Sequence, residues 1–459
     1  MLRSLGELNC PKKPLNVEPY PDSVTKEYEI QVITPLFGGG VEAGENDPIT
    51  LVRPSSIRGH LRFWWRVTRG ARCKSIPELL QRESEIWGSV NNPSSVVIEV
   101  NKINTKETSR RSPPDYGFSD RLGPELYALF SAKKEICSEG FSFVLTIRWL
   151  QHKKLQQMRD GENKELENSN AWPKAKFIDD IGPDVKEALQ AWVNFGGIGG
   201  RTRRGCGALF CKQLAIDSIA EFNRYPFNIL YKSSFSDPLR AWSESVRVIK
   251  NFRQSFRGLK HDKIIPTRRG SKTIRVFGRS YWPEPDSIRK ITGCSLKKPN
   301  KNNFDHSIPQ TPTDFFPRAE LGLPIIFHFA DGPGKNSALS NIDPPDVTLI
   351  PVTSNGKDGT RMASPAITRP LRLATGEDIA VIIVLNSKPL PPLKLVGDGP
   401  NLPHDIAQNK IANSALASYP RSPMGPSAVT GEIHSKKGSA LEAFINYAKD
   451  DEQFKEVLR

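Results

Sequence analysis

Apolar and polar residues alternate along residues 28–34 (YEIQVIT), as they do in a strand with one buried face. This strand leads into a glycine-rich turn, PLFGGG, at residues 35–40. Helical spacing of apolar residues predicts helices at about 53–72 and 182–195, and Pro183 suits the first turn of the second helix. Further strand patterns occupy residues 95–100, 141–149 and 208–214. The order β-α-β-β-α-β over about residues 25–215 predicts a ferredoxin-like domain.

The second half of the chain is less regular. Helical patterns occupy residues 237–256 and 439–458, and apolar runs typical of strands lie at 273–278, 323–330 and 378–386. Residues 151–176, 296–314 and 387–436 are polar or rich in Pro, Asn, Ser and Lys, and we expect loops there. The pattern alone does not show a second copy of the first domain.

The predicted helix at 53–72 is strongly amphipathic. At 100° per residue its arginines share one stripe, and most of its apolar residues lie on the opposite side. The stripe contains Arg58, Arg62, Arg66, Arg69 and Arg72. Trp65 falls inside the stripe, where it would either stack on an unpaired base or pack at a domain edge. His60 falls in the middle of the apolar face, which favours a buried structural histidine over a general base.

Two interpretations of the arginine stripe follow. In one, it is a solvated face whose arginines pair with acids elsewhere in the chain. In the other, its guanidinium groups bind phosphate, because no acid lies between Asp47 and Glu78 and the cations are all arginine rather than lysine.

Composition supports a polyanionic partner. Among 459 residues, Lys and Arg exceed Asp and Glu by 15. Such a balance favours nucleic acid first and an acidic membrane surface second. The sequence contains no apolar stretch of membrane-spanning length and no apolar run typical of a signal peptide. Six cysteines without a C-x-x-C pair argue against a zinc ribbon or disulfide framework, so we expect a cytoplasmic protein without metal or cofactor.

A second basic motif, FGGIGGRTRRGCG, spans residues 195–207 between a predicted helix and a predicted strand. Glycines allow close approach of the backbone to a ligand, and their amides can hold phosphate oxygens beside the arginines. The spacing is not that of a nucleotide P-loop, and the glycines end a helix instead of opening one, which argues against a dinucleotide site. The alternative is a flexible glycine hinge.

These motifs together resemble a known family. The loop at 195–207, closing a β-α-β-β-α-β unit, is similar to the hallmark of the RAMP superfamily of CRISPR-associated RNA-binding proteins. TPLFGGG followed by RPSSIRGHLRFWWR resembles the family of the first subunit of the type III-B (Cmr) effector complex. The segments SEIWGSV (84–90), FPRAELGLPIIF (316–327) and RMASPAITRPLRL (361–373) resemble further motifs of that family.

The resemblance implies an α+β fold with two ferredoxin-like domains, whose antiparallel sheets carry helices on one face. We expect an N-terminal extension at 1–27, a first domain at 28–220 and a more divergent second domain at 221–459. The resemblance also implies a non-catalytic RNA-binding subunit near the 3′ end of the guide crRNA. Its partners would be crRNA, single-stranded target RNA and other Cmr subunits.

The RNA-binding candidates come from both motifs. They are Arg53, Arg58, Arg62, Trp65, Arg66 and Arg69 of the helix, and Gly196, Gly197, Gly199, Gly200, Arg201, Arg203 and Arg204 of the loop. In a ferredoxin-like unit the fourth strand lies beside the first, so the loop should come close to the start of the helix. We therefore expect one continuous basic groove formed by Arg53, Arg58, Arg62, Arg66 and the loop, with Trp65 at its edge.

Two other functions stay open at this point. One is a repeat-processing, metal-free endoribonuclease of the same superfamily, although the histidines show no partner pattern and His261-Asp262 is weak evidence for a metal nuclease. The other is a single-stranded RNA-binding protein that acts outside any CRISPR complex.

Overall fold

The computed structural model describes most of the chain between Ser23 and residue 457. The described ranges are 23–104 (without 43, 48 and 49), 110–111, 128–129, 136–150, 180–253, 256–257, 261–267, 270–276, 279–280, 282–293, 316–329, 344–386, 390–397, 410–411 and 439–457. The predicted loops at 151–176 and 296–314 and residues 1–22 of the N-terminal extension lie outside these ranges. Residues 23–27 of the expected extension belong to the first strand. Of the predicted loop at 387–436 only 390–397 and 410–411 are described, and they contain the strands Leu393–Gly397 and Lys410–Ile411 where a loop was expected. The side chains of His261 and Asp262 are likewise outside the description.

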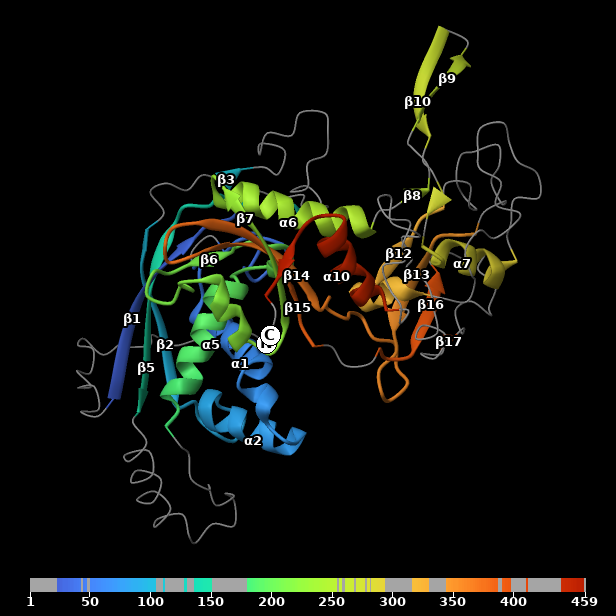
Figure 1. Cartoon of the computed structure of the whole chain (residues 1–459). Coiled ribbons are helices and arrows are strands. Elements are labelled where there is room, and N and C mark those ends of the chain that lie inside the picture. The colour runs from blue at the N-terminus through green and yellow to red at the C-terminus, as the bar shows by residue number, and fades with distance from the viewer. Residues whose placement is uncertain are drawn as a thin grey trace, which may run out of the picture.

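The first half of the chain forms the predicted ferredoxin-like unit. Its antiparallel sheet has the strand order β2 (Val96–Asn104), β5 (Ser142–Leu150), β1 (Ser23–Val32) and β6 (Leu209–Phe210). Helices α1 (Pro54–Val67) and α5 (Gly182–Phe195) cover one face of this sheet (Figure 1). The expected neighbouring positions of the first and fourth strands are confirmed.

One helix of this unit was not expected. Helix α2 (Ile76–Trp87) follows α1 after a short 3-10 turn at Gly70–Arg72. Ser75 caps it, since its side chain accepts a hydrogen bond from the Glu78 amide. Helix α1 therefore ends at Val67, before the predicted residue 72. Helix α2 places the carboxylate of Glu83 beside the arginine stripe.

The second half repeats the same topology with a different sequence. In chain order its elements are β7 (Asn228–Phe235), α6 (Pro238–Arg253), β14 (Ala366–Arg372), β15 (Asp378–Val384), α10 (Ala440–Asp450) and β18 (Lys455–Glu456). The sheet order is β14-β15-β7-β18, which places the fourth strand beside the first, as in the first unit. Two ferredoxin-like units are therefore present, as the resemblance implied.

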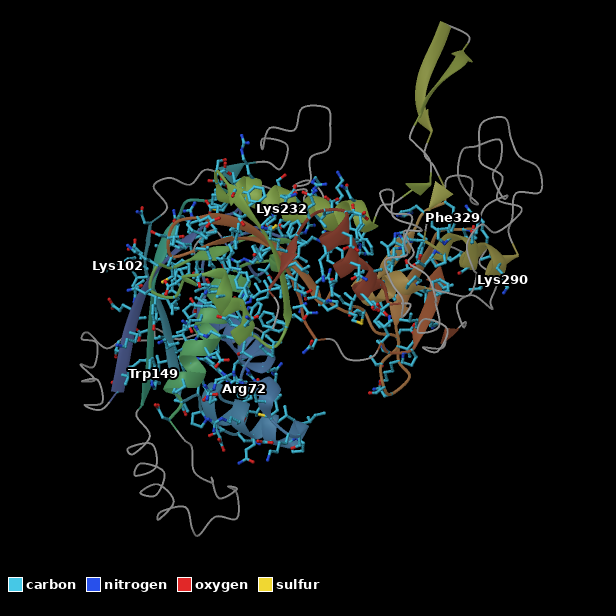
Figure 2. The ribbon with its side chains drawn as sticks, viewed as in Figure 1. Arg72, Lys102, Trp149, Lys232, Lys290 and Phe329 are labelled. Atoms are coloured by element: carbon cyan, nitrogen blue, oxygen red, sulfur yellow. The ribbon has the colours of Figure 1, made fainter. Side chains whose placement is uncertain are left out.

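A third, smaller sheet lies to one side of the second unit (Figure 1). It contains β12 (Ile325–Phe327), β13 (Val347–Pro351), β16 (Leu393–Gly397) and β17 (Lys410–Ile411), with α7 (Glu284–Thr292) beside it. Two further antiparallel pairs join β8 (Phe256–Arg257) to β11 (Arg279–Ser280) and β9 (His261–Thr267) to β10 (Gly270–Val276), and β3 (Arg110–Arg111) pairs with β4 (Ile136–Cys137). Phe329 and Lys290 belong to this outlying region, away from Trp149 of the first sheet (Figure 2).

The two ferredoxin-like units share one apolar core. Its largest cluster contains residues of the first sheet and of α1 and α5, together with alternate residues of β14 and β15. The opposite face of β14 and β15 packs with α6 and α10. Strand β15 is consequently buried along its whole length. This core contains residues from both sides of the expected domain boundary near residue 220. The division of the chain into domains at 28–220 and 221–459 therefore stays a prediction.

Candidate nucleic-acid interface

The glycine-rich loop is anchored to the turn that follows β1. The Gly200 amide donates to the Phe37 carbonyl at 2.6 Å, and the Gly207 amide donates to the Pro35 carbonyl at 2.8 Å. The Thr34 hydroxyl donates to the Gly205 carbonyl at 2.6 Å. The loop is therefore a hydrogen-bonded structure joined to the first strand, which does not fit the alternative of a flexible hinge.

Several loop glycines are required by this packing. Gly207 has a φ of +62°, and a Cβ there would lie 2.1 Å from the Ile198 carbonyl oxygen. Gly199 has a φ of +76°, and its Cβ would lie 2.5 Å from a methyl group of Leu36. Side chains at these two positions would be strained and would clash.

The expected phosphate cradle of loop amides is only partly available. The amides of Gly196, Ile198, Gly200, Gly205 and Gly207 already donate to protein carbonyls. Within the described residues, the amides of Gly197 and Gly199 make no such bond. Positive charge at this loop therefore comes mainly from arginine side chains.

The loop arginines lie near one another and near an arginine of the second unit. The Arg201 guanidinium lies 4.1 Å from the centre of the Phe37 ring and donates to the Ala128 carbonyl at 3.2 Å. Burial lowers the pKa of Arg201, and the positive charges of Arg204 and Arg361 lower it further. Mutual repulsion of this kind is typical of a surface that receives an anion.

Arg203 joins the loop to the second unit. It donates to the Ser364 carbonyl, and its guanidinium lies 5.2 Å from the centre of the Phe63 ring of α1. Burial lowers its pKa. Within the described part of the chain, neither Arg203 nor Arg361 forms an ion pair with a carboxylate.

Two side chains of the second unit hold this loop in place. Arg369 of β14 is fully buried and donates to the carbonyls of Gly196, Leu209 (3.2 Å) and Pro370 (2.8 Å). Burial lowers the Arg369 pKa to about 9, so the side chain remains charged at neutral pH. Trp242 of α6 donates its indole N–H to the Arg204 carbonyl at 2.7 Å. No role was predicted for Arg361, Arg369 or Trp242. The signal in the sequence was Arg369, a charged residue between the apolar residues of ITRPL.

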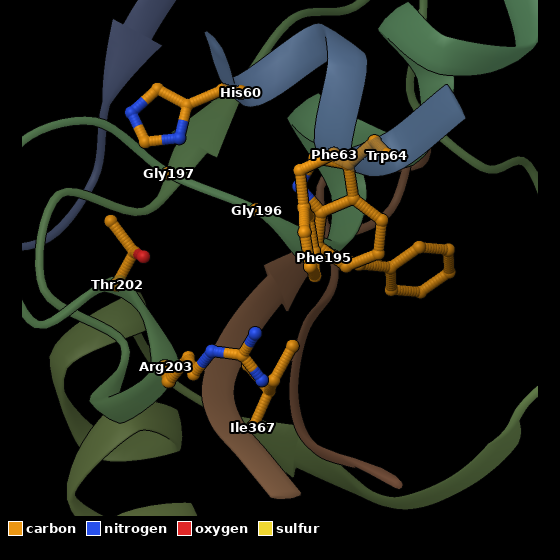
Figure 3. A pocket seen from close by; sticks show the side chains of 9 residues that line it. All are labelled: His60, Phe63, Trp64, Phe195, Gly196, Gly197, Thr202, Arg203 and Ile367. Carbon is orange, nitrogen blue, oxygen red and sulfur yellow. The ribbon is translucent and has the colours of Figure 1, made fainter. Parts of the chain in front are cut away.

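A pocket of about 200 Å³ opens where the loop meets α1 and β14 (Figure 3). His60, Phe63 and Trp64 of α1 line one side, and residues of the loop and Ile367 of β14 line the rest. His60 is partly exposed and stacks on Trp192, with 6.5 Å between ring centres. Burial lowers the His60 pKa to about 4, so the ring is neutral at physiological pH.

The arginine stripe of α1, in contrast, is largely neutralised. Arg62 and Arg66 both bond the buried carboxylate of Glu83 in α2, each at 2.6 Å. Burial alone would raise the Glu83 pKa, but the hydrogen bonds from Arg66 and Arg62 lower it overall. Of the interpretations considered above, pairing with distant acids is the one that the structure shows for these arginines.

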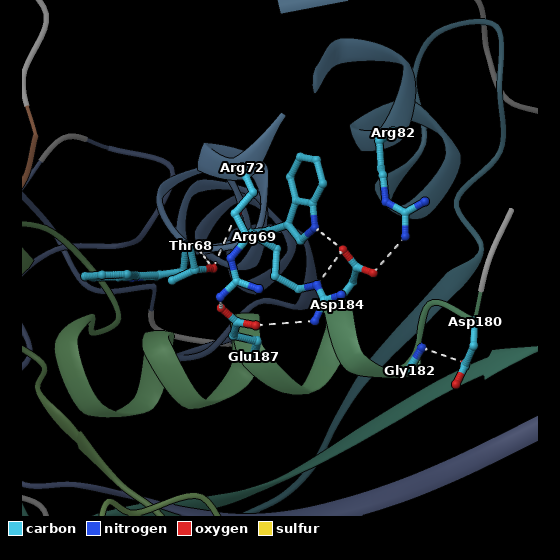
Figure 4. Close-up of polar contacts among 10 residues, drawn as sticks. Thr68, Arg69, Arg72, Arg82, Asp180, Gly182, Asp184 and Glu187 are labelled. Atoms are coloured by element: carbon cyan, nitrogen blue, oxygen red, sulfur yellow. Dashed lines mark hydrogen bonds and ion pairs between the residues drawn. The ribbon is translucent and has the colours of Figure 1, made fainter. Parts of the chain in front are cut away.

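The next turn is neutralised by α5 (Figure 4). Arg69 lies 3.3 Å from Asp184 and 3.4 Å from Glu187, and Arg72 lies 3.3 Å from Glu187. Trp65 is 1% exposed and donates to Asp184 at 2.7 Å. The expectation that Trp65 lies at the edge of an RNA groove is therefore wrong, because the acids of α5 draw this side of the helix inward.

The remaining helix candidates differ from one another. Arg53 donates to the carbonyls of Gly39 (2.6 Å) and Gly40 (3.1 Å), so it supports the glycine turn. Arg58 is exposed and forms no ion pair within the described residues. The loop contacts the Phe63 and Trp64 side of α1, opposite the stripe. The single groove expected from the sequence is therefore not formed, although the helix start and the loop are close in space.

The described residues contain no group of three His, Cys, Asp or Glu side chains placed to hold a metal ion. None of the described helices is long and apolar enough to cross a membrane.

Comparison with known proteins supports part of the resemblance. Residues 29–210 match the model of the RAMP superfamily. No curated protein matches the sequence. Among solved structures, Cmr1 from Pyrococcus furiosus is similar at 14% identity and a TM-score of 0.42, with 85% of this chain and 94% of that chain covered.

Two other solved structures are similar at lower scores. A chain of the type III-B Cmr-beta complex bound to cognate target RNA has 13% identity and a TM-score of 0.33, covering 80% of this chain and 95% of that chain. Cmr6 from Pyrococcus furiosus has 11% identity and a TM-score of 0.21, covering 42% of this chain and 98% of that chain. TM-scores below 0.5 do not establish a shared fold. The fold of this chain is therefore described by its own strand orders.

Proposed function

Residues 29–210 belong to the RAMP superfamily, and from this premise we propose that the protein is a non-catalytic RNA-binding subunit of a type III-B CRISPR effector complex. Its partners are the guide crRNA, single-stranded target RNA and other Cmr subunits in the cytoplasm. It contacts RNA near the 3′ end of the guide and helps to capture the target. The sequence motifs, the family match and the charge distribution support this proposal.

The observation that carries the RNA-binding part is the contrast between two sets of arginines. Most arginines of the α1 stripe face buried or half-buried carboxylates of α2 and α5. At the loop, the pKa of Arg201 is lowered by burial and by neighbouring cations. Arg203 and Arg361 are not neutralised by a carboxylate of the described residues. We call the surface formed by Arg201, Arg203, Arg204 and Arg361 the loop arginine cluster, and we propose that it binds the RNA phosphates.

The site geometry favours this reading over a metal-free ribonuclease. General acid–base cleavage needs groups whose pKa values lie near the working pH. His60 is the histidine beside the loop, and its pKa of about 4 leaves it unprotonated at neutral pH. A ring with a pKa of about 4 is a weak general base for activating a ribose 2′-hydroxyl, and at neutral pH it carries no extra proton for a leaving group. The ring stacks on Trp192.

The proposal is tested with the full chain in two measurements. Binding of a fluorescein-labelled single-stranded RNA is followed by anisotropy at several salt concentrations, and log Kd should rise with log salt by about 0.7 per phosphate contact. The same RNA is incubated with and without Mg²⁺ and analysed on a gel, where it should stay intact. Binding that does not depend on salt would refute the phosphate contacts, and specific cleavage would refute the non-catalytic role.

Assignment to the complex needs a separate experiment. The tagged chain is co-expressed with the other Cmr subunits and a CRISPR array, purified, and examined for bound proteins and RNA. Co-purification of crRNA and Cmr subunits is the expected result. Recovery of the chain alone, with unselective binding of any RNA, would favour a stand-alone RNA-binding protein.

A further inference from the structure

We propose that the pocket between α1, the glycine-rich loop and β14 holds one unstacked base of the bound RNA. This proposal rests on the proposed RNA-binding function and adds a base-binding site to the phosphate contacts. The pocket lies directly beside the loop arginine cluster, since Arg203 belongs to both. A strand whose phosphates lie on the cluster therefore has a base within reach of the pocket.

The volume fits a single aromatic ring system. An engineered cavity of about 150 Å³ in another protein holds benzene. The pocket described here has about 200 Å³ and is partly open. Figure 3 shows the side chains that line it. It is therefore large enough for an aromatic heterocycle and too small for a folded segment of protein.

The walls suit a flat ring. Phe63 is partly exposed, and its ring lies 5.2 Å from the Arg203 guanidinium and edge-on to Trp64. Trp64 and Phe195 form the apolar depth of the pocket. Unstacked RNA bases are typically recognised by stacking on aromatic side chains and arginine planes.

The polar groups suit the edge of a base. The neutral His60 ring carries one donor and one acceptor, and the Thr202 hydroxyl can do both. The buried Gly197 amide donates to no acceptor within the described residues. Arg203 is partly buried without a carboxylate partner, an arrangement that an adjacent phosphate would stabilise.

The test separates the base from the backbone. Affinities are measured for a ten-nucleotide oligoadenylate and for the same ribose-phosphate chain without bases. The affinity for oligoadenylate divided by the affinity for the baseless chain is then compared between variants. Phe63→Leu should reduce that ratio roughly 5- to 100-fold, the range expected when one base loses its stacking partner. The affinity for the baseless chain should not change, because its phosphates still meet the loop arginine cluster.

A matched control is available in the same unit. Phe210 is also partly exposed, with the Arg372 guanidinium 5.7 Å from its ring, but it does not line the pocket. Phe210→Leu should leave the ratio unchanged, and Phe63→Tyr should restore most of it. Thermal melting of each variant shows whether the fold is kept, and Thr202→Val tests the pocket at a position outside the core.

Other outcomes overturn the proposal. If Phe63→Leu weakens both ligands equally, Phe63 supports the fold or the cluster and does not hold a base. If both affinities are unchanged while assembly with Cmr subunits weakens, the occupant is a side chain of a partner. If the wild-type protein binds the baseless chain but shows no preference for oligoadenylate, the phosphate contacts stand and the base pocket is refuted. Absence of any RNA binding refutes both.

Discussion

Replacing Arg369 with methionine should weaken the contact between the two ferredoxin-like units. The side chain extends from β14 of the second unit to the carbonyls of Gly196 and Leu209 in the first. Gly196 directly follows the last residue of α5, so the cation also faces the negative end of that helix. Methionine fills a similar volume without donating to any of these carbonyls.

The expected loss of stability follows from the carbonyl groups that lose their hydrogen bonds to Arg369. Each buried carbonyl without a partner costs about 1–3 kcal/mol, and two carbonyls of the first unit lose theirs. Methionine also removes a charge that is costly to bury, which offsets part of the loss. We expect a net decrease of about 3 kcal/mol in the free energy of unfolding, because two orphaned acceptors outweigh the relief. Arg369→Lys keeps the charge but cannot donate to all of these carbonyls at once. Its free energy of unfolding should therefore lie between those of the wild type and Arg369→Met.

The assay is urea unfolding followed by tryptophan fluorescence. Thr368→Val is the control, since Thr368 is the adjacent buried residue of the same strand and its hydroxyl has no hydrogen-bond partner among the described residues. That variant should be neutral or slightly more stable. If Arg369→Met has the same unfolding midpoint as the wild type, the hydrogen bonds from Arg369 to Gly196 and Leu209 contribute nothing to stability and the reasoning fails.

Three further predictions concern pH and local packing. In the folded protein the His60 pKa is about 4, below the unfolded value, so stability should decrease as pH falls from about 6.5 toward 4, and His60→Gln should flatten this part of the profile measured by thermal melting. Glu83→Gln should lower stability by about 1 kcal/mol above the carboxyl's unfolded pKa, with a difference that vanishes as pH falls through the lowered folded pKa, in urea titrations at several pH values. Gly207→Ala should reduce soluble yield and melting temperature, because its Cβ would lie 2.1 Å from the Ile198 carbonyl; a wild-type melting temperature would contradict this.

Hydrophobic periodicity predicted most of the first unit but not helix α2. Alternation and helical spacing identified three of its strands in their approximate places and both main helices, and the strand order followed from the topology. The fourth strand was the weakest prediction: it spans only Leu209–Phe210 instead of 208–214. The position of this strand is fixed by backbone hydrogen bonds between the preceding loop and the turn after β1, and a pattern of apolar residues does not predict such bonds.

The second unit was harder to predict for identifiable reasons. Strand β14 carries an arginine and a proline between apolar residues. The arginine is tolerated because it reaches carbonyls of the other unit, and the proline because β14 is an edge strand of its sheet. Strand β7 was not predicted. The last helix ends at Asp450 and not at residue 458, and the short strand Lys455–Glu456 follows it. The third sheet is assembled from segments on both sides of β14 and β15, an arrangement that local patterns do not reveal.

The site shows the limit of reading charge from one helix. The arginine stripe was expected to be free because the nearest acids in the sequence are distant from it. Its partner Glu83 lies on the unpredicted helix α2, and Asp184 lies 115 positions after Arg69 on α5 but 3.3 Å away in space. The loop was identified from the sequence as a basic, glycine-rich motif with a flexible hinge as the alternative, whereas its hydrogen bonds to the turn after β1 and the contributions of Arg361 and Arg369 depend on tertiary packing.

The central claim is that RNA phosphates bind at the loop arginine cluster and not along the α1 stripe. The most direct test measures RNA affinity for Arg361→Glu and Arg204→Glu beside Arg72→Glu, which makes the same charge change at an exposed residue of the stripe. The two cluster variants should each bind roughly tenfold more weakly and lower the salt slope by about 0.7, as expected for one lost phosphate contact, while Arg72→Glu binds like the wild type. Equal losses in all three variants, or a loss confined to Arg72→Glu, would contradict the claim.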